Sequence, residues 1–233
     1  MTISTFPTSS SSLRERLDVV RGGITEACHR SERNPNEVTL IVVTKFHPAA
    51  LVRELYALGV RDFGENRHQE AELKASELID LPKTWHFIGQ LQSNKAAAVR
   101  RYADVVHSVD RSAIVAALGK ASEARLDVFL QLNLTADLGR GGVAPANLVE
   151  LAEQAAATPS LNVRGVMAVA PLDAVARQAF ERVREASEDL QSVIPQATLI
   201  SAGMSHDFAD AIAEGATHLR IGTAITGERP PAS

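Results

Sequence analysis

The chain has 233 residues, enough for one large domain, and its 45% hydrophobic and 22% charged residues are typical of a globular protein. Its 24 basic and 28 acidic residues give a net charge of −4, which argues against nucleic acid or an anionic membrane surface as a partner. The single cysteine, Cys28, excludes an intrachain disulfide and argues against a structural zinc site. With no secretory signal and no apolar run of bilayer length, we expect a cytoplasmic protein.

The N-terminal part of the sequence changes character twice. Residues 1–12 are rich in Ser and Thr, and we expect them to form a disordered tail. From Leu13 onward apolar residues recur every three or four positions, which predicts a helix that ends near Asn34. Residues 38–44 are a nearly unbroken β-branched run, and such runs are typical of strands that are buried on both faces.

From this first strand onward, strand-like and helical segments alternate. The predicted strands are 38–44, 60–63, 85–89, 103–109, 126–133, 161–169, 197–201 and 217–222. The helices predicted after the first seven strands are 48–59, 66–78, 95–102 with Ser93 as N-cap, 111–123, the segment around 148–155, 173–191, and a short helix from Ser205 as N-cap to Gly215. This alternation predicts a parallel sheet, and eight units in this length predict one α/β domain, a (β/α)8 TIM-type barrel over residues 13–233.

The two ends of the predicted barrel differ from a regular repeat. The last helix is missing or very short, and we expect the extra N-terminal helix to cover the gap. A doubly wound open sheet is the alternative topology. That fold would carry a glycine-rich loop after its first strand, and the sequence there is TKFHPA.

Functional residues of such barrels lie at the C-terminal ends of the strands. Among the five lysines, only Lys45 follows a predicted strand directly. Apolar neighbours at a barrel mouth would favour its neutral amine, which can form an imine with a carbonyl compound. The alternative is a lysine that extends into solvent or forms a salt bridge.

Two loops and one arginine complete the candidate site. The loops Ser201–Ser205 and Gly222–Ala224 follow the seventh and eighth strands, and their small and hydroxyl residues favour a phosphate site in the place where barrels often have one. Ordinary turn and capping chemistry is the alternative. Arg220 lies within the last strand and needs a partner there, which is either a carboxylate or the ring nitrogen of a bound pyridine.

An imine-forming lysine, a phosphate site and an arginine for a ring nitrogen together suggest pyridoxal 5'-phosphate (PLP). Seven segments resemble the signature stretches of the pyridoxal phosphate homeostasis protein family, in family order over nearly the whole chain. They are VTK (43–45), DFGEN (62–66), WHFIGQLQSNK (85–95), VHSVDR (106–111), RGVMAV (164–169), AGMSHD (202–207) and RIGTAITGER (220–229). The family's barrel resembles the N-terminal domain of alanine racemase.

The resemblance implies a role for each matching residue. Lys45 would form the internal aldimine with PLP, Asn66 would lie beside the cofactor, and Met167 would lie against its ring. Arg220 would face the pyridine nitrogen and disfavour its protonation, which fits a carrier better than a transaminase. The residues that would surround the phosphate are Ser201, Gly203, Met204, Ser205, Gly222 and Thr223.

The chain departs from the family pattern at Ala202, at His206 and in the loop after the fifth strand. That loop reads LGRG (138–141) where the family often has S-K-S-G. Arginine cannot form an imine, so hand-off of the cofactor through a second lysine at Arg140 is not expected. Lys95 has either a solvated or capping role or a substrate-facing one.

Two histidines, His86 and His107, fall near predicted strand ends. We expect them to be hydrogen-bonded structural groups rather than catalysts.

We therefore expect a monomeric PLP carrier of cofactor homeostasis, without dedicated catalytic activity, that exchanges PLP with apoenzymes and responds to amino acids. The alternative is a racemase-like PLP enzyme. Such racemases add a second domain and a tyrosine base, whereas Tyr56 and Tyr102 fall in helical segments here. A Schiff-base aldolase acting on a sugar phosphate would explain Lys45 and the two loops, but not Arg220.

Overall fold

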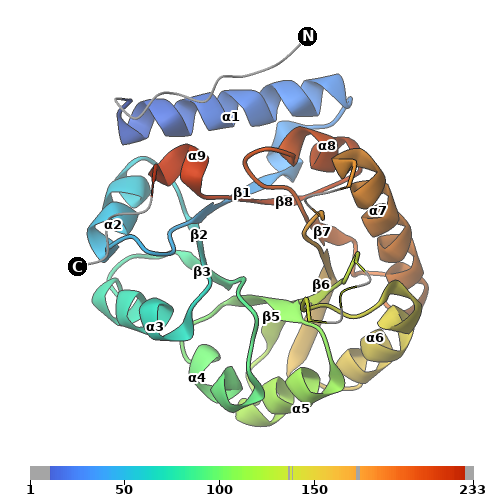
Figure 1. Cartoon of the computed structure of the whole chain (residues 1–233). Helices are drawn as coiled ribbons and strands as arrows, with labels where there is room; N and C mark the ends of the chain where they lie inside the picture. The colour runs from blue at the N-terminus through green and yellow to red at the C-terminus, as the bar shows by residue number, and fades with distance from the viewer. Residues whose placement is uncertain (1–10, 136, 138, 172–173, 229–233) are drawn as a thin grey trace.

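The computed structural model describes residues 11–135, 137, 139–171 and 174–228. Within these ranges eight parallel strands close into a barrel in chain order, and Figure 1 looks along its axis. The strands are β1 (Thr39–Val43), β2 (Asp62–Glu65), β3 (Thr84–Phe87), β4 (Val105–Val109), β5 (Leu126–Gln131), β6 (Leu161–Met167), β7 (Leu199–Ser201) and β8 (His218–Ile221). The predicted (β/α)8 barrel is confirmed.

Helices surround the strands, as Figure 1 shows. They are α1 (Leu13–Arg30), α2 (Ala49–Ala57), α3 (His68–Glu77), α4 (Ala96–Val99), α5 (Ser112–Ala121), α6 (Leu148–Ala156), α7 (Ala176–Val193), α8 (Phe208–Ala213) and α9 (Thr223–Thr226). Short 3-10 turns lie at Pro35–Glu37 (η1), Ser93–Lys95 (η2) and Pro145–Asn147 (η3). None of the helices in the described ranges has the length and apolar character needed to cross a membrane.

Helix α1 occupies the place of a regular last helix, because α9 is a single turn. It packs against α8 and α9, and the Arg16 side chain donates from Nε to the Ile225 carbonyl oxygen at 2.7 Å. The helix begins with a capping box in which the Ser12 hydroxyl accepts the Glu15 N–H and the Glu15 carboxylate accepts the Ser12 N–H. Ser12 thus belongs to this helix, whereas residues 1–10 of the predicted tail lie outside the described residues.

The barrel closes where β8 pairs with β1. Ile41 lies opposite Arg220, and Val42 lies opposite Ile221. Since β2 pairs with the other edge of β1, the C-terminal ends of β8, β1 and β2 lie side by side.

Both faces of the sheet are buried, but they differ in chemistry. An apolar layer fills the space between strands and helices, as expected for a parallel sheet covered by helices. The barrel interior holds a smaller apolar cluster around Val105, Phe129 and Met167, next to the buried side chains of His86 and His107.

Strand β2 extends two residues beyond the predicted segment 60–63, through Gly64 to Glu65. The prediction is wrong at this end because Glu65 is 1% exposed, and hydrophobicity patterns do not assign an acidic residue to a buried strand. The carboxylate of Glu65 is paired with the ammonium group of Lys74 at 2.7 Å.

The two predicted serine N-caps are also wrong. Gln92 is the N-cap of the 3-10 turn η2, and Ser93 lies inside that turn. Helix α8 begins only after Asp207, whose carboxylate accepts the N–H of Met204 at 2.6 Å. The loop after β7 is therefore longer than predicted, and Ser205 lies within it.

Gly89 of the HFIG motif allows the chains after β2 and β3 to approach each other. A Cβ atom at Gly89 would lie 1.9 Å from the carbonyl oxygen of Asn66. We predict that Gly89→Ala lowers the free energy of unfolding by at least about 2 kcal/mol, because the backbone at Asn66 or at Gly89 must move to make room for the added Cβ atom. Chemical denaturation measures the change.

Gly22→Ala in α1 is the matched control, since a Cβ atom there would meet nothing within 4 Å. It should be neutral or stabilising by up to about 1 kcal/mol. An equal loss in both variants would contradict the close-approach argument.

Candidate functional site

Lys45 lies at the C-terminal mouth of the barrel, two residues after β1 ends. Its Nζ is 5.9 Å from the centroid of the Phe46 ring. The side chain is exposed, so our expectation of apolar surroundings that favour the neutral amine is wrong. Lys45 is accessible to a ligand at the mouth for the same reason.

The residues after β8 and β2 flank this lysine. A Cβ atom at Gly222 would lie 3.4 Å from the carbonyl oxygen of Val43, so the chain after β8 passes close to the end of β1. On the other side Asn66 follows β2, and its buried Oδ1 atom has no hydrogen-bond partner. A buried amide without a partner is costly, which makes Asn66 a natural contact for a ligand. Asn66 also lines a cavity of about 220 Å³ together with Lys95.

The residues of the two loops predicted to hold a phosphate differ in the free hydrogen-bond donors that they offer. The N–H groups of Ser205, Thr223 and Ala224 have no hydrogen-bond partner within the described residues, and neither do the hydroxyl groups of Ser205 and Thr223. Free amides and hydroxyls grouped at adjacent strand ends are donors suited to an anion.

Three other residues predicted to surround the phosphate have hydrogen-bonding or packing roles within the protein. The Met204 N–H donates to Asp207, and the Ser201 hydroxyl lies inside the barrel, fully buried. Gly203 has a φ of +95°, and a Cβ atom there would lie 2.8 Å from Cβ of Ala211, so packing and backbone conformation both require glycine.

Arg220 is 5% exposed, and its partners are neutral. Its Nη1 donates to the Ser201 hydroxyl at 2.7 Å, and its Nη2 donates to the Ala168 carbonyl oxygen at 2.8 Å. No carboxylate in the described chain forms an ion pair with it, so the salt-bridge alternative is wrong. Burial lowers the pKa of Arg220 to about 10, and nearby Asp207 opposes this shift. The guanidinium is therefore a buried cation with N–H donors left for a ligand.

A chain of hydrogen bonds runs through the barrel interior from Arg220 to Asp62. Ser201 Oγ lies 2.9 Å from His107 Nδ1, and His107 Nε2 lies 2.9 Å from His86 Nδ1. His86 Nε2 then lies 3.1 Å from Asp62 Oδ1. The two histidines are thus hydrogen-bonded structural groups, as predicted from the sequence.

One arrangement of protons satisfies this whole chain when both rings are neutral. The Asp62 carboxylate accepts from His86 Nε2, which leaves His86 Nδ1 to accept from His107 Nε2. His107 Nδ1 then accepts the Ser201 hydroxyl proton, and Ser201 Oγ accepts from Arg220. Every donor along this hydrogen-bonded path points away from Arg220. The guanidinium therefore meets a hydrogen-bond acceptor, the Ser201 oxygen, at this end of the path.

Burial lowers the pKa of two interior histidines, His107 and His218. The pKa of His107 lies well below the usual 6.5, first because of burial and then because of the nearby His86 and Arg220. Burial also lowers the pKa of His218 to about 4. His218 lies against the Phe129 ring and shares a hydrogen bond of 2.8 Å with Thr217.

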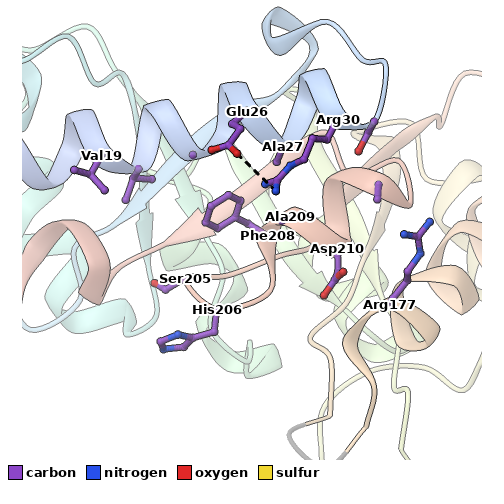
Figure 2. Close-up of a pocket in the computed structure, with 14 residues that line it drawn as sticks. Val19, Glu26, Ala27, Arg30, Arg177, Ser205, His206, Phe208, Ala209 and Asp210 are labelled. Atoms are coloured by element: carbon purple, nitrogen blue, oxygen red, sulfur yellow. Dashed lines mark ion pairs between the residues drawn. The ribbon is translucent and has the colours of Figure 1, made fainter. Parts of the chain in front are cut away.

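A cavity of about 640 Å³ lies away from the mouth, between α1, α7 and α8 (Figure 2). Phe208 and Val19 line it, and the Glu26–Arg30 ion pair of 3.7 Å lies at its edge. Ser205, from the loop after β7, also lines this cavity. The strand-end residues Lys45, Asn66 and Arg220 do not line it.

One group of buried charges near Lys45 was missed from the sequence. Lys74 is 5% exposed, and its ammonium group bonds to Glu65, Glu70 and the backbone of Thr44. A signal existed, since Lys74 falls on the same helical face as Ala71 and Leu78, both fully buried. A lysine at a core-facing position requires buried carboxylates.

Comparison with known proteins places the chain in two steps. Residues 27–230 match the family model described as alanine racemase, N-terminal domain, so the chain belongs to this family of barrels. The curated pyridoxal phosphate homeostasis protein of Pseudomonas aeruginosa is 44% identical over 225 residues, covering 94% of this chain and 96% of that protein. The protein of the same name from Escherichia coli is 40% identical, covering 93% and 97%. The chain is thus a member of the pyridoxal phosphate homeostasis protein family.

A solved structure supports the same assignment. PipY of Synechococcus elongatus, determined with PLP bound, has a TM-score of 0.82 and 39% sequence identity, and the match covers 93% of this chain and all of PipY.

Protonation of His218 should link stability to pH. Its folded-state pKa of about 4 lies below the unfolded value of 6.5, so the unfolded chain binds more protons as the pH falls through this window. We predict that the free energy of unfolding falls between pH 7 and pH 5, with roughly 1–2 kcal/mol of the loss due to His218. Denaturant titrations of the wild type and His218→Gln at both pH values measure this share, and identical losses would refute it.

Proposed function

We propose that this protein binds PLP and carries it as an imine on Lys45, as part of cofactor homeostasis. The observation that carries the proposal is the accessible Lys45 amine at the same barrel mouth as the buried cation Arg220 and the free amides of Thr223 and Ala224. The names of the relatives and the PLP in PipY support it. When bound, PLP would supply an aldehyde, and the accessible Lys45 amine would condense with it, with loss of one water molecule.

Arg220 sets the electronic character of the ligand. In the proposed complex its guanidinium donates to the pyridine nitrogen, which then acts as an acceptor. Protonation of that nitrogen would bring two positive charges into contact. An unprotonated ring is a poor electron sink, which suits storage of the aldehyde better than transamination. Met167, 2% exposed in the barrel interior, would lie against the ring, and Asn66 beside it.

The phosphate ester would bind at the ends of β7 and β8. Ser205 and Thr223 offer both N–H and hydroxyl donors, and Gly222 keeps the approach to the loop free of a side chain. Gly203 supports the loop through packing, whereas Ser201 contributes by holding Arg220. Met204 could contribute only through its side chain, since its N–H donates to Asp207 and its carbonyl oxygen accepts from the N–H groups of Asp207 and Phe208.

A carrier explains the site better than a racemase-like enzyme. Tyr56 lies in α2, outside the barrel. Tyr102 lies just after α4, with its hydroxyl buried and without a hydrogen-bond partner, stacked on His68. Burial raises the pKa of Tyr102, which makes it a poor base. We propose that residues 13–233 act as one cytoplasmic, monomeric PLP-binding domain that delivers PLP to apoenzymes and responds to amino acids.

Lys45→Ala should abolish the visible absorption band of the imine, because the substitution removes the amine that is proposed to form it. Borohydride reduction of the wild type followed by peptide mapping should place the cofactor on Lys45. Lys120→Ala, at an exposed position of α5, is the control and should keep the band. A Lys45→Ala protein with an unchanged band after dialysis would refute the proposal.

The phosphate contacts should dominate affinity. Pyridoxal, which lacks the phosphate, should bind at least about 100-fold more weakly than PLP, because it leaves the charge-assisted hydrogen bonds at the two loops unmade. Equilibrium titration of the apo-protein with both aldehydes measures the ratio. Equal affinities would place the phosphate outside these loops.

A further inference from the structure

A buried network of charges lies directly behind Lys45 and is not explained by cofactor binding alone. It consists of Lys74 and Glu70 from α3 and Glu65 from β2. Lys74 uses all three donors of its ammonium group, at 2.7 Å each, to the Thr44 carbonyl oxygen, to Glu65 Oε1 and to Glu70 Oε1. We call these three residues the Lys74 network.

The network holds the backbone on both sides of Lys45. Before Lys45, the Thr44 carbonyl accepts from Lys74, and the Thr44 hydroxyl donates to Glu65 Oε1 at 2.6 Å. After Lys45, the Phe46 N–H donates to Glu70 Oε1 at 2.5 Å. Lys45 itself is exposed and takes no part in these hydrogen bonds.

The backbone that is held in this way is strained. Phe46 has a φ of +70°, in the left-handed region that bulky side chains rarely occupy. Such a conformation persists only where the surroundings enforce it, and strained residues of this kind cluster at functional sites. The hydrogen bond from Phe46 N–H to Glu70 is one contact that enforces it, so the direction in which the chain leaves Lys45 depends on α3.

The network also excludes Lys74 as the lysine that forms the imine. Lys74 is 5% exposed and bonded to two carboxylates and a carbonyl, so its amine has no free donor and no access to a ligand. Lys45 has the opposite environment, with a fixed backbone and an accessible amine.

We infer that Lys74, Glu65 and Glu70 are positioning residues, which fix the Thr44–Phe46 backbone so that the Lys45 amine starts from a defined point at the barrel mouth. This inference rests on the proposed function, because it concerns the residue that forms the imine. The network acts through Lys45 and does not touch the phosphate loops, so it should control the covalent step and leave the non-covalent step unchanged.

Two ligands separate these steps. PLP reports binding plus imine formation, through its absorption band. An analogue of PLP with a methyl group in place of the aldehyde reports binding alone, through quenching of protein fluorescence or calorimetry. Glu70→Ala is the principal variant, because it removes the acceptor for Phe46 N–H and leaves the Lys74–Glu65 pair intact. Lys74→Met is the second variant.

In Glu70→Ala the rate constant of imine formation should fall about 10-fold or more, since small misplacements of reacting groups have effects of this size. The affinity for the methyl analogue should stay within about 2-fold. Glu70→Gln keeps an acceptor oxygen at the same place and should restore most of the rate. Glu72→Ala is the matched control, since Glu72 lies on the same helix but pairs with Arg101 at the surface.

The outcomes distinguish the inference from the proposed function. A wild-type protein without an imine on Lys45 would end both. A wild-type imine that forms at the same rate in Glu70→Ala would overturn the positioning role alone. Equal losses for PLP and the methyl analogue would also overturn it, because they would indicate a general disturbance of the mouth. Lys74→Met leaves the buried carboxylate of Glu65 and the partly buried carboxylate of Glu70 without their cation. If this variant does not fold, Glu70→Ala and Glu70→Gln decide the question.

Discussion

The register between β8 and β1 is the constraint on which the candidate site depends. Arg220 lies opposite Ile41, and the residues that follow these strands meet at one mouth of the barrel. Val43 and Gly222 are far apart in the sequence, yet barrel closure brings them close together, and Lys45 and Thr223 follow them. A shift of one residue in this pairing would turn Arg220 toward the helices and remove the cation from the interior. The site is therefore a property of the closed barrel and not of any single loop.

The structure holds its two buried cations near the mouth in contrasting ways. Lys74 forms ion pairs with two carboxylates, which compensate its positive charge and give it a structural role. Arg220 has only a hydroxyl and a carbonyl as hydrogen-bond partners, and a hydrogen-bonded pair of histidines orients the hydroxyl. No carboxylate of the described residues forms an ion pair with Arg220, so its guanidinium keeps an electrostatic attraction for an electron-rich ligand. The placement of acidic side chains thus distinguishes the structural cation, Lys74, from Arg220, the cation that we propose contacts the ligand.

Much of this organisation can be predicted from the sequence. The alternation of β-branched runs with helical segments was sufficient for the barrel, because each strand of a parallel sheet is buried on both faces. The position of Lys45 after β1 and of Arg220 within β8 followed from the same pattern. The local sequence pattern was therefore sufficient to place Lys45 and Arg220 at or near strand ends, and the predicted barrel placed these strand ends at one mouth.

Other features depend on contacts between distant residues, which a pattern cannot reveal. The exposure of Lys45 depends on how the loops at the mouth are arranged. The strand position of Glu65 depends on Lys74, and the free Ser205 depends on Asp207, which makes the loop after β7 longer. The path from Arg220 to Asp62 joins five strands, so no sequence window contains it. Polar groups in the interior were harder to predict than apolar ones, because their partners decide whether they can be buried.

The position of α1 has a consequence for how the chain is made. Its apolar face, with Leu17, Val20 and Ile24, is covered by α8 and α9, which follow β7 and β8 in the sequence. During synthesis α1 therefore stays without these partners until the segment that holds α8, β8 and α9 has been made. Barrel closure also requires β8, and a nascent chain truncated before β8 would expose an unmatched sheet edge together with this helix face. Such a chain is a natural substrate for chaperones until β8 and α9 emerge.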